Sequence, residues 1–78
     1  MKKVRVELQL SLIRYSNNQT GEISLVMEDD ANVHDVLEFF NLVHGEVGVV
    51  LINGKLAAED QELPDNATVI LYPVFGGG

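Results

Sequence analysis

The C-terminal end of the chain carries the group whose surroundings most clearly suggest chemistry. The sequence ends in Pro73-Val74-Phe75-Gly76-Gly77-Gly78, so the terminal carboxylate stands on three residues that have no side chains. Because glycine lacks a Cβ, such a tail can lie extended, pass through a narrow channel and place its carboxylate inside another protein's active site. From Pro73 onwards the tail reaches at most roughly 20 Å. The pattern favours chemistry that takes place away from the folded body.

The residues that precede the glycines favour a docking tail over a simple linker. A flexible linker has no need of Val74 and Phe75, whereas a tail that enters a partner's groove can bury both as apolar anchors. We therefore predict that Pro73, Val74, Phe75, Gly76 and Gly77 form a partner-binding tail. The alternatives are a frayed glycine end without function, and packing of the two apolar residues at the end of a sheet.

Length and composition allow one small domain. The chain has 78 residues, of which 46% are hydrophobic, and a domain of this size has little room for a deep active site of its own. The absence of cysteine excludes disulfides, a thiol nucleophile and thiolate-bound metal centres. His34 and His44 do not share a metal-ligand spacing, and Glu28-Asp29-Asp30 lacks the pattern of a calcium loop. We therefore predict no metal site, no bound cofactor and no catalytic site of its own.

The charge balance is strongly acidic, with 12 acidic against 5 basic residues and a net charge of −7. This charge repels nucleic-acid phosphates and anionic lipid and favours partners with basic surfaces, although solubility explains it equally well. No apolar stretch is long enough to span a membrane, and none at the N-terminus is typical of a secretion signal. We expect a cytoplasmic protein without nucleic-acid or membrane partners.

Two periodicities predict the elements that must position the tail. Alternating apolar and polar residues over 4–12 predict a long strand, and a polar turn over 15–21 leads into a second strand over 23–27. Asn32 is a candidate N-cap, with Asp35 at the position of the capping-box acid. Apolar residues at helical spacing predict a helix from about Val33 to Val43 that ends at Gly45.

The second half of the sequence predicts further strands. An apolar run over 47–52 is followed by Asn53-Gly54, a strong turn signal, by a short strand over 55–57, and by a last strand over 68–72. We predict an α+β fold of the β-grasp, or ubiquitin-like, type, a mixed sheet of four to five strands with one main helix on one face. The β-grasp domain is expected to cover 1–72 and the flexible carrier tail 73–78. Any of Val49, Leu51, Ile70 and Tyr72 that point away from the helix are expected to form an apolar patch for partners.

The order of these features resembles a known family. The hairpin and helix, the Asn53-Gly54-Lys55 turn, the Leu63-Pro64-Asp65 loop and the ending Tyr72-Pro73-Val74-Phe75-Gly76-Gly77 occur as in the MoaD/ThiS ubiquitin-like sulfur carriers. Within that family the chain most resembles the small subunit of molybdopterin synthase. The family usually ends in Gly-Gly, whereas this chain has three terminal glycines.

The resemblance implies a reaction cycle carried out with partners. A ubiquitin-activating-like enzyme would use ATP and magnesium to adenylate the carboxylate of Gly78, or of Gly77 if Gly78 is removed. A sulfur donor protein would then convert the adenylate to a thiocarboxylate, which the carrier delivers to the large subunit of molybdopterin synthase. The resemblance implies that the chain is part of an enzyme only as the sulfur-donating subunit of molybdopterin synthase. A thiamine-pathway carrier, a protein modifier that joins lysines, and a noncovalent β-grasp module remain alternatives.

Overall fold

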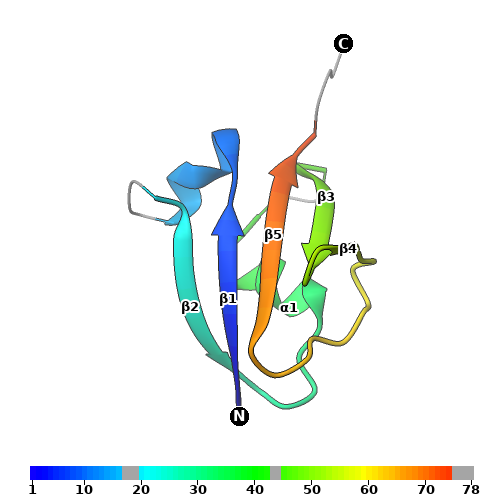
Figure 1. Cartoon of the computed structure of the whole chain (residues 1–78). Coiled ribbons are helices and arrows are strands. Elements are labelled where there is room, and N and C mark those ends of the chain that lie inside the picture. Colours follow the sequence, from blue (N-terminus) through cyan, green and yellow to red (C-terminus); the bar gives the residue numbers. More distant parts are fainter. Residues whose placement is uncertain (17–19, 43–44, 75–78) are drawn as a thin grey trace.

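The computed structural model describes residues 1–16, 20–42 and 45–74. Its strands form one five-stranded sheet in the order β2-β1-β5-β3-β4, and α1 lies behind it (Figure 1). The elements are β1 (Lys2–Leu8), the 3₁₀ helix η1 (Leu10–Ser16), β2 (Glu22–Met27), α1 (Val33–Phe39), β3 (Val47–Ile52), β4 (Lys55–Leu56) and β5 (Ala67–Pro73). β5 pairs in parallel with β1 and antiparallel with β3. The predicted β-grasp fold is confirmed.

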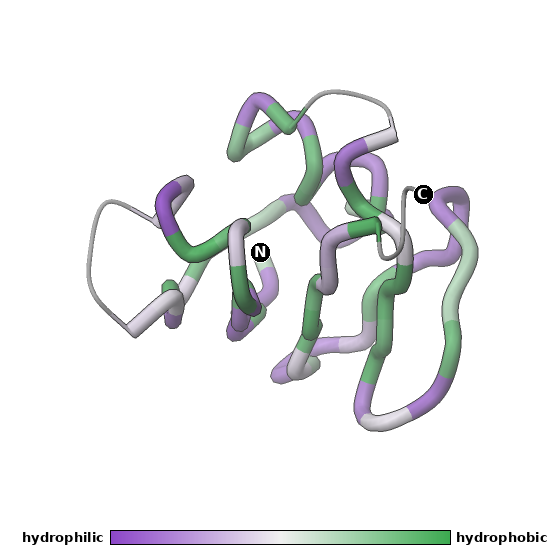
Figure 2. The backbone as a smooth tube through the Cα atoms, turned by 90° about the horizontal axis from the view of Figure 1, so that it is seen from above, coloured by the Kyte–Doolittle hydropathy of each residue, from purple (hydrophilic) through white to green (hydrophobic). Residues whose placement is uncertain are grey.

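The hydrophobic core lies between the sheet and α1. In β1 and β5, buried residues alternate with more exposed ones, because successive side chains of a strand point to opposite faces. Figure 2, which looks down from the end at which β5 finishes, shows hydrophobic and hydrophilic segments alternating along the backbone. The helix contributes its own apolar stripe to the same core. The main core residues are Val4, Val6, Leu8, Val33, Val36, Leu37, Phe40, Val50, Ile52, Val69 and Leu71.

The first strand is shorter than predicted. β1 ends at Leu8, and the backbone amide of Gln9 still donates to the carbonyl of Leu71 at 3.0 Å. Leu10 then takes a left-handed conformation with φ of 53°, which turns the chain out of the sheet and into η1. Leu12 reaches the core from the 3₁₀ helix, so the alternation that suggested a continuing strand has a different cause. The strand prediction for the last part of 4–12 was therefore wrong.

The start of α1 is confirmed and carries a capping box. The side chain of Asn32 accepts a hydrogen bond from the amide of Asp35 at 3.1 Å, and the Asp35 carboxylate accepts one from the amide of Asn32 at 2.8 Å. Two amides that have no partner within the helix are satisfied in this way. The local sequence therefore fixes where the helix begins.

The end of α1 comes earlier than predicted. Asn41, and not Gly45, takes the left-handed conformation that ends the helix, with φ of 56°. The amides of Asn41 and Leu42 each donate at 3.0 Å to carbonyls in the last turn of α1, the pattern of a Schellman motif. Asparagine adopts this conformation more easily than most residues other than glycine, which explains why the helix stops here.

The last strands agree with the sequence prediction. Asn53 and Gly54 both have positive φ, at 52° and 86°, as a tight turn between β3 and β4 requires. The Asn53 side chain also accepts a hydrogen bond from the amide of Thr68 at 2.9 Å, which ties this turn to β5. β5 continues through Pro73 and ends at the opposite end of the sheet from the N-terminus (Figure 1).

A buried lysine joins the start of the sheet to two loops. Lys2 is 5% exposed, and its ammonium donates to the backbone carbonyls of Asp29, at 2.8 Å, and of Leu63. The first of these carbonyls belongs to the segment between β2 and α1, and the second to the segment before β5. Burying a lysine is costly unless its charge has such partners, so this side chain holds both loops against β1.

Lys2→Met is expected to lower the free energy of unfolding by about 1–3 kcal/mol, because it leaves the two carbonyls without their donor. Urea denaturation followed by circular dichroism measures this change. Lys3→Met is the matched control, since the side chain of Lys3 is exposed. Equal midpoints for the two variants would contradict the assigned role of Lys2.

Candidate functional site

The base of the predicted tail is part of the folded sheet. Pro73 is the last residue of β5 and is buried, whereas Val74 follows the strand and is 51% exposed. The remaining predicted site residues, Phe75, Gly76, Gly77 and Gly78, lie outside the described residues, and their roles stay predictions. The described part therefore defines where the tail starts. It starts from the central strand of five, which has a neighbour on each side.

A glycine in β3 makes room for the start of the tail. Val47 pairs with Pro73 and Val49 pairs with Tyr72, so the register shifts at Gly48 and one residue bulges. A Cβ at Gly48 would lie 3.0 Å from both the carbonyl oxygen of Pro73 and the Cα of Val74. Sequence reasoning missed this role, although a glycine within an apolar strand is a known sign of a bulge or a close backbone approach.

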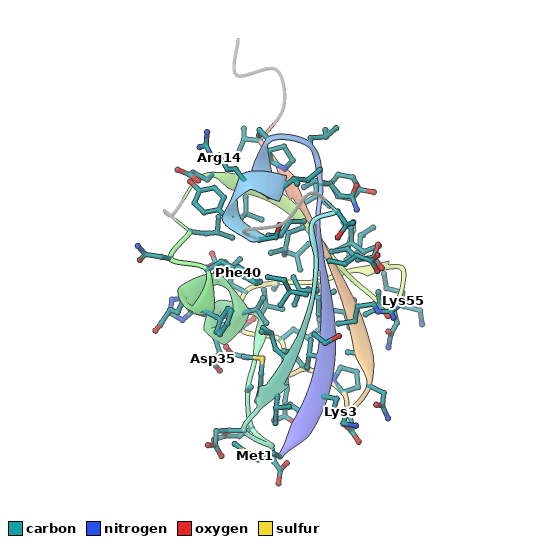
Figure 3. All side chains as sticks on the ribbon, turned by 90° about the vertical axis from the view of Figure 1, so that its left-hand side faces the viewer. Met1, Lys3, Arg14, Asp35, Phe40 and Lys55 are labelled. Carbon is teal, nitrogen blue, oxygen red and sulfur yellow. The ribbon has the colours of Figure 1, made fainter. Side chains whose placement is uncertain are left out.

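A short network of side chains holds the segment beside this bulge. The amide of Val74 donates to the carbonyl of Glu46 at 3.2 Å, and the Glu46 carboxylate accepts a hydrogen bond from the Tyr15 hydroxyl at 2.5 Å. The guanidinium of Arg14 lies 5.1 Å from the centre of the Tyr15 ring. Its hydrogen bond to the Tyr15 hydroxyl raises the pKa of Arg14 above the ordinary value, so the group stays charged. Figure 3 labels Arg14 at the end of the molecule where η1 lies.

This network joins residues distant in sequence, which is why local patterns did not reveal it. The sequence predicts a turn that begins at Tyr15, and no periodicity relates Tyr15 to Glu46, which lies 31 positions later. A tyrosine in a polar segment does weakly indicate such a contact, because burial of its ring is favourable and its hydroxyl then needs a hydrogen-bond partner. The network fixes the strand from which the tail leaves.

The outer face of the sheet carries an apolar patch next to the tail base. The residues of β3 and β5 that alternate with Val50, Ile52, Val69 and Leu71 point away from α1, because those four are buried in the core. Leu56 of β4 pairs with Leu51 and is 77% exposed, so it extends the same surface. We call this surface the outer apolar patch, and it comprises Val49, Leu51, Leu56, Ile70 and Tyr72.

Other sequence candidates have local structural roles. Nδ1 of His34 lies 3.0 Å from a carboxylate oxygen of Glu38 one turn further along α1, and Asp29 pairs with the N-terminal ammonium at 3.0 Å. His44 lies outside the described residues. Within 1–16, 20–42 and 45–74, no three histidine or acidic side chains gather as a metal site. The described helices also include none that is long and apolar enough to cross a membrane.

Comparison with known proteins places this geometry in a family. The family model described as Mut7-C ubiquitin matches residues 1–77. The structure is similar to small archaeal modifier protein 1 from Haloferax volcanii, with 17% identity, a TM-score of 0.76 and coverage of 94% of this chain and 98% of that chain. It is also similar to molybdopterin converting factor subunit 1 from Pyrococcus furiosus, with 20% identity, a TM-score of 0.77 and the same coverage of both chains. No curated protein matches the sequence.

A third solved structure, the solution structure of another Haloferax volcanii protein, has 20% identity and a TM-score of 0.77 over 99% of this chain and 87% of that one. At such identities the solved structures establish the fold. Together with the family match, they confirm the predicted likeness to ubiquitin-like proteins of the MoaD/ThiS type.

Gly48→Ala is expected to push Pro73 and Val74 away from β3, because the added Cβ meets backbone atoms at 3.0 Å. Faster hydrogen exchange of the Val74 amide, measured by NMR, is the readout, with a loss of about 1–2 kcal/mol in stability. Gly54→Ala is the control, since its Cβ meets nothing within 4 Å but its φ is positive. Gly54→Ala should lower the free energy of unfolding by a similar amount and leave the Val74 amide protected from hydrogen exchange. Unchanged exchange in Gly48→Ala would refute the role of the bulge.

Proposed function

We propose that this chain, which belongs to the Mut7-C ubiquitin family, is a carrier whose C-terminal carboxylate is activated by a partner enzyme and loaded with sulfur. The observation that carries the proposal is the direct continuation of the central strand β5 into a tail that ends in three glycines. A tail whose base is held in the sheet and whose last residues have no side chains suits a carboxylate that must reach into a second protein's active site.

The proposed chemistry begins at the carboxylate of Gly78, or of Gly77 if Gly78 is removed first. A carboxylate oxygen attacks the α-phosphorus of ATP, pyrophosphate leaves, and the product is an acyl-adenylate. Magnesium held by the activating enzyme would stabilise the phosphate charge in this step. A persulfide sulfur of the donor protein then attacks the acyl carbon and AMP leaves, which gives an acyl disulfide. A thiol of the donor protein cleaves the S–S bond of this acyl disulfide, so that the carrier leaves as the thiocarboxylate and the donor is left with a disulfide. ATP and magnesium are used by the partner, and the carrier itself holds no cofactor.

The acceptor we favour is a molybdopterin precursor bound by the large subunit of molybdopterin synthase. The similarity to molybdopterin converting factor subunit 1 supports this acceptor. The similarity to small archaeal modifier protein 1 favours a second candidate function, in which the same activated tail is joined to a lysine amine of a target protein. Both functions share the first, adenylating step and differ in the nucleophile that follows.

We further propose that the activating enzyme docks on the outer apolar patch. This surface lies beside Pro73, so a partner bound there receives the tail directly. The net charge of −7 favours a basic rim around the partner's contact surface and speeds the encounter. A cytoplasmic location, where ATP and donor proteins are available, belongs to the same proposal.

The test is the intact mass of the chain after incubation with ATP, magnesium, a sulfur donor and an enzyme that activates carriers of the MoaD type. A mass increase equal to the exchange of one oxygen for sulfur supports the carrier function and shows whether Gly78 is retained. Isopeptide-linked conjugates in cells that disappear when the three glycines are deleted would favour the modifier. An unchanged mass, with the activating enzyme active on its own carrier, would contradict the proposed sulfur loading.

Gly77→Trp is expected to leave the urea midpoint unchanged and to abolish loading, because a bulky side chain does not pass through a channel shaped for glycine. The same mass measurement is the readout. The adenylation step is measured separately by ATP–pyrophosphate exchange. A loading rate equal to that of the unaltered chain would argue against a narrow channel.

Leu56→Ser is expected to raise the KM of the activating enzyme for this chain about fivefold, because it removes an exposed apolar contact from the outer apolar patch. Val26→Ser is the matched control. Val26 is also an exposed apolar residue of an edge strand, but it lies at the opposite edge of the sheet. Similar KM values for both variants would exclude docking on the patch.

A further inference from the structure

The strand β2 forms an edge of the sheet to which another strand can be added. In the part of the chain that the structure describes, β2 has β1 on one side and no strand on the other. Figure 3 looks at this edge, with α1 beside it. The amide of Leu8 donates to the carbonyl of Gly21, and hydrogen-bonded pairs alternate along an antiparallel ladder. The backbone groups of Ser24 and Val26 therefore point towards the outer side of β2.

An open groove runs between this edge and α1. It has a volume of about 700 Å³ and is lined by β2, α1 and the segment that joins them. Its apolar lining includes Leu25 and Met27 of β2 and Phe39 of α1. Phe39 is 60% exposed although it packs edge-on against Phe40, with ring centres 5.0 Å apart. Val26, 62% exposed, adds a further apolar contact at the rim.

The polar lining of the groove is acidic. Four carboxylates line it, those of Glu28, Asp30, Asp35 and Glu38. The N-terminal ammonium of Met1, which also lines the groove, is already engaged, because it lies 3.0 Å from Asp29. Asp35 also caps the helix, because its carboxylate accepts a hydrogen bond from the amide of Asn32. A ligand with positive charge is therefore attracted to this groove.

We infer that the groove between β2 and α1 is a second docking site, which takes an extended basic segment of a partner protein as an added strand beside β2. The segment would pair its backbone with Ser24 and Val26, place apolar side chains near Phe39 and set lysines or arginines against the carboxylates. A second copy of this chain fits less well, since it would bring two acidic rims together at a net charge of −7 each.

The position of the groove separates it from the tail. β2 and β4 are the two edges of the sheet, with three strands between them. The groove lies at the β2 edge, whereas the outer apolar patch covers β3, β4 and β5. A partner held in the groove therefore leaves the base of the tail accessible, and this inference holds whether or not sulfur is the cargo.

The test uses a fluorescent peptide that alternates valine or isoleucine with lysine or arginine and is about six residues long, the usual length of a strand. We expect saturable binding, seen by fluorescence anisotropy, and NMR shift changes at Ser24, Val26 and Phe39 but not at Leu56. The same peptide with N-methyl groups on alternate amides should bind at least tenfold more weakly, because it cannot pair as a strand. Equal binding of the methylated peptide, or shifts centred on β4 and β5, would overturn the inference.

Two sets of variants test the strand pairing and the charge separately. Val26→Pro removes an outward amide and should abolish binding, while β1 keeps its partners because that amide does not face it. If this variant does not fold, Phe39→Ala replaces it, with Leu56→Ala as the control for loss of an exposed apolar side chain. Retained binding in the folded β2 or α1 variant contradicts the assignment.

The charge variant is Glu28→Gln with Asp30→Asn, which should weaken peptide binding about fivefold at low salt. Glu7→Gln with Asp60→Asn removes the same charge outside the groove and should change binding less than twofold. Equal weakening by both pairs would show that only the net charge of the chain attracts the peptide, and would overturn a site at this groove.

Discussion

The placement of β5 between β1 and β3 is the constraint on which the rest of the structure depends. β1 and β5 run in parallel and each has an antiparallel neighbour, so β2 and β3 run in the same direction, and α1 carries the chain from the end of β2 back to the start of β3. The crossing covers one face of the sheet and creates the core. The same pairing fixes where β5 finishes, which is the end at which the tail begins. Fold and tail position thus have a common cause.

The two edges of this sheet differ in chemistry. Beside β4 the exposed surface is apolar and continues to the base of the tail, whereas beside β2 an apolar groove is rimmed by carboxylates. A domain of this size has little room for a deep pocket that surrounds a substrate, so the proposed partners must recognise it by its surfaces. Two separate surfaces allow two partners to select the chain by different interactions, one by apolar contact and one by charge and strand pairing.

Local sequence predicted the fold wherever a single residue or a short pattern of residues determines the backbone conformation. The Asn32 cap, the Asn53-Gly54 turn and the alternation in β1 and β5 are of this kind, and the structure has all of them. The predictions failed at Leu10 and Asn41, where non-glycine residues adopt a left-handed backbone that the periodicity of the sequence does not indicate. For the candidate site, the sequence predicted the tail, in which the roles of Phe75 to Gly78 stay predictions, and all residues of the outer apolar patch except Leu56. The support from Gly48 depends on strand register, which composition and periodicity do not contain.

The central position of β5 also decides how the protein responds to a pull on its end. A partner that draws the tail into a channel applies tension along β5, and the ladders to β1 and β3 resist it together. An edge strand would have only one such ladder to hold it. Rupture then requires many backbone hydrogen bonds to fail at once, and resistance to force is governed by the rate of unfolding. The chain is therefore a good mechanical anchor for its own tail, and a poor substrate for an unfoldase that pulls from the C-terminus.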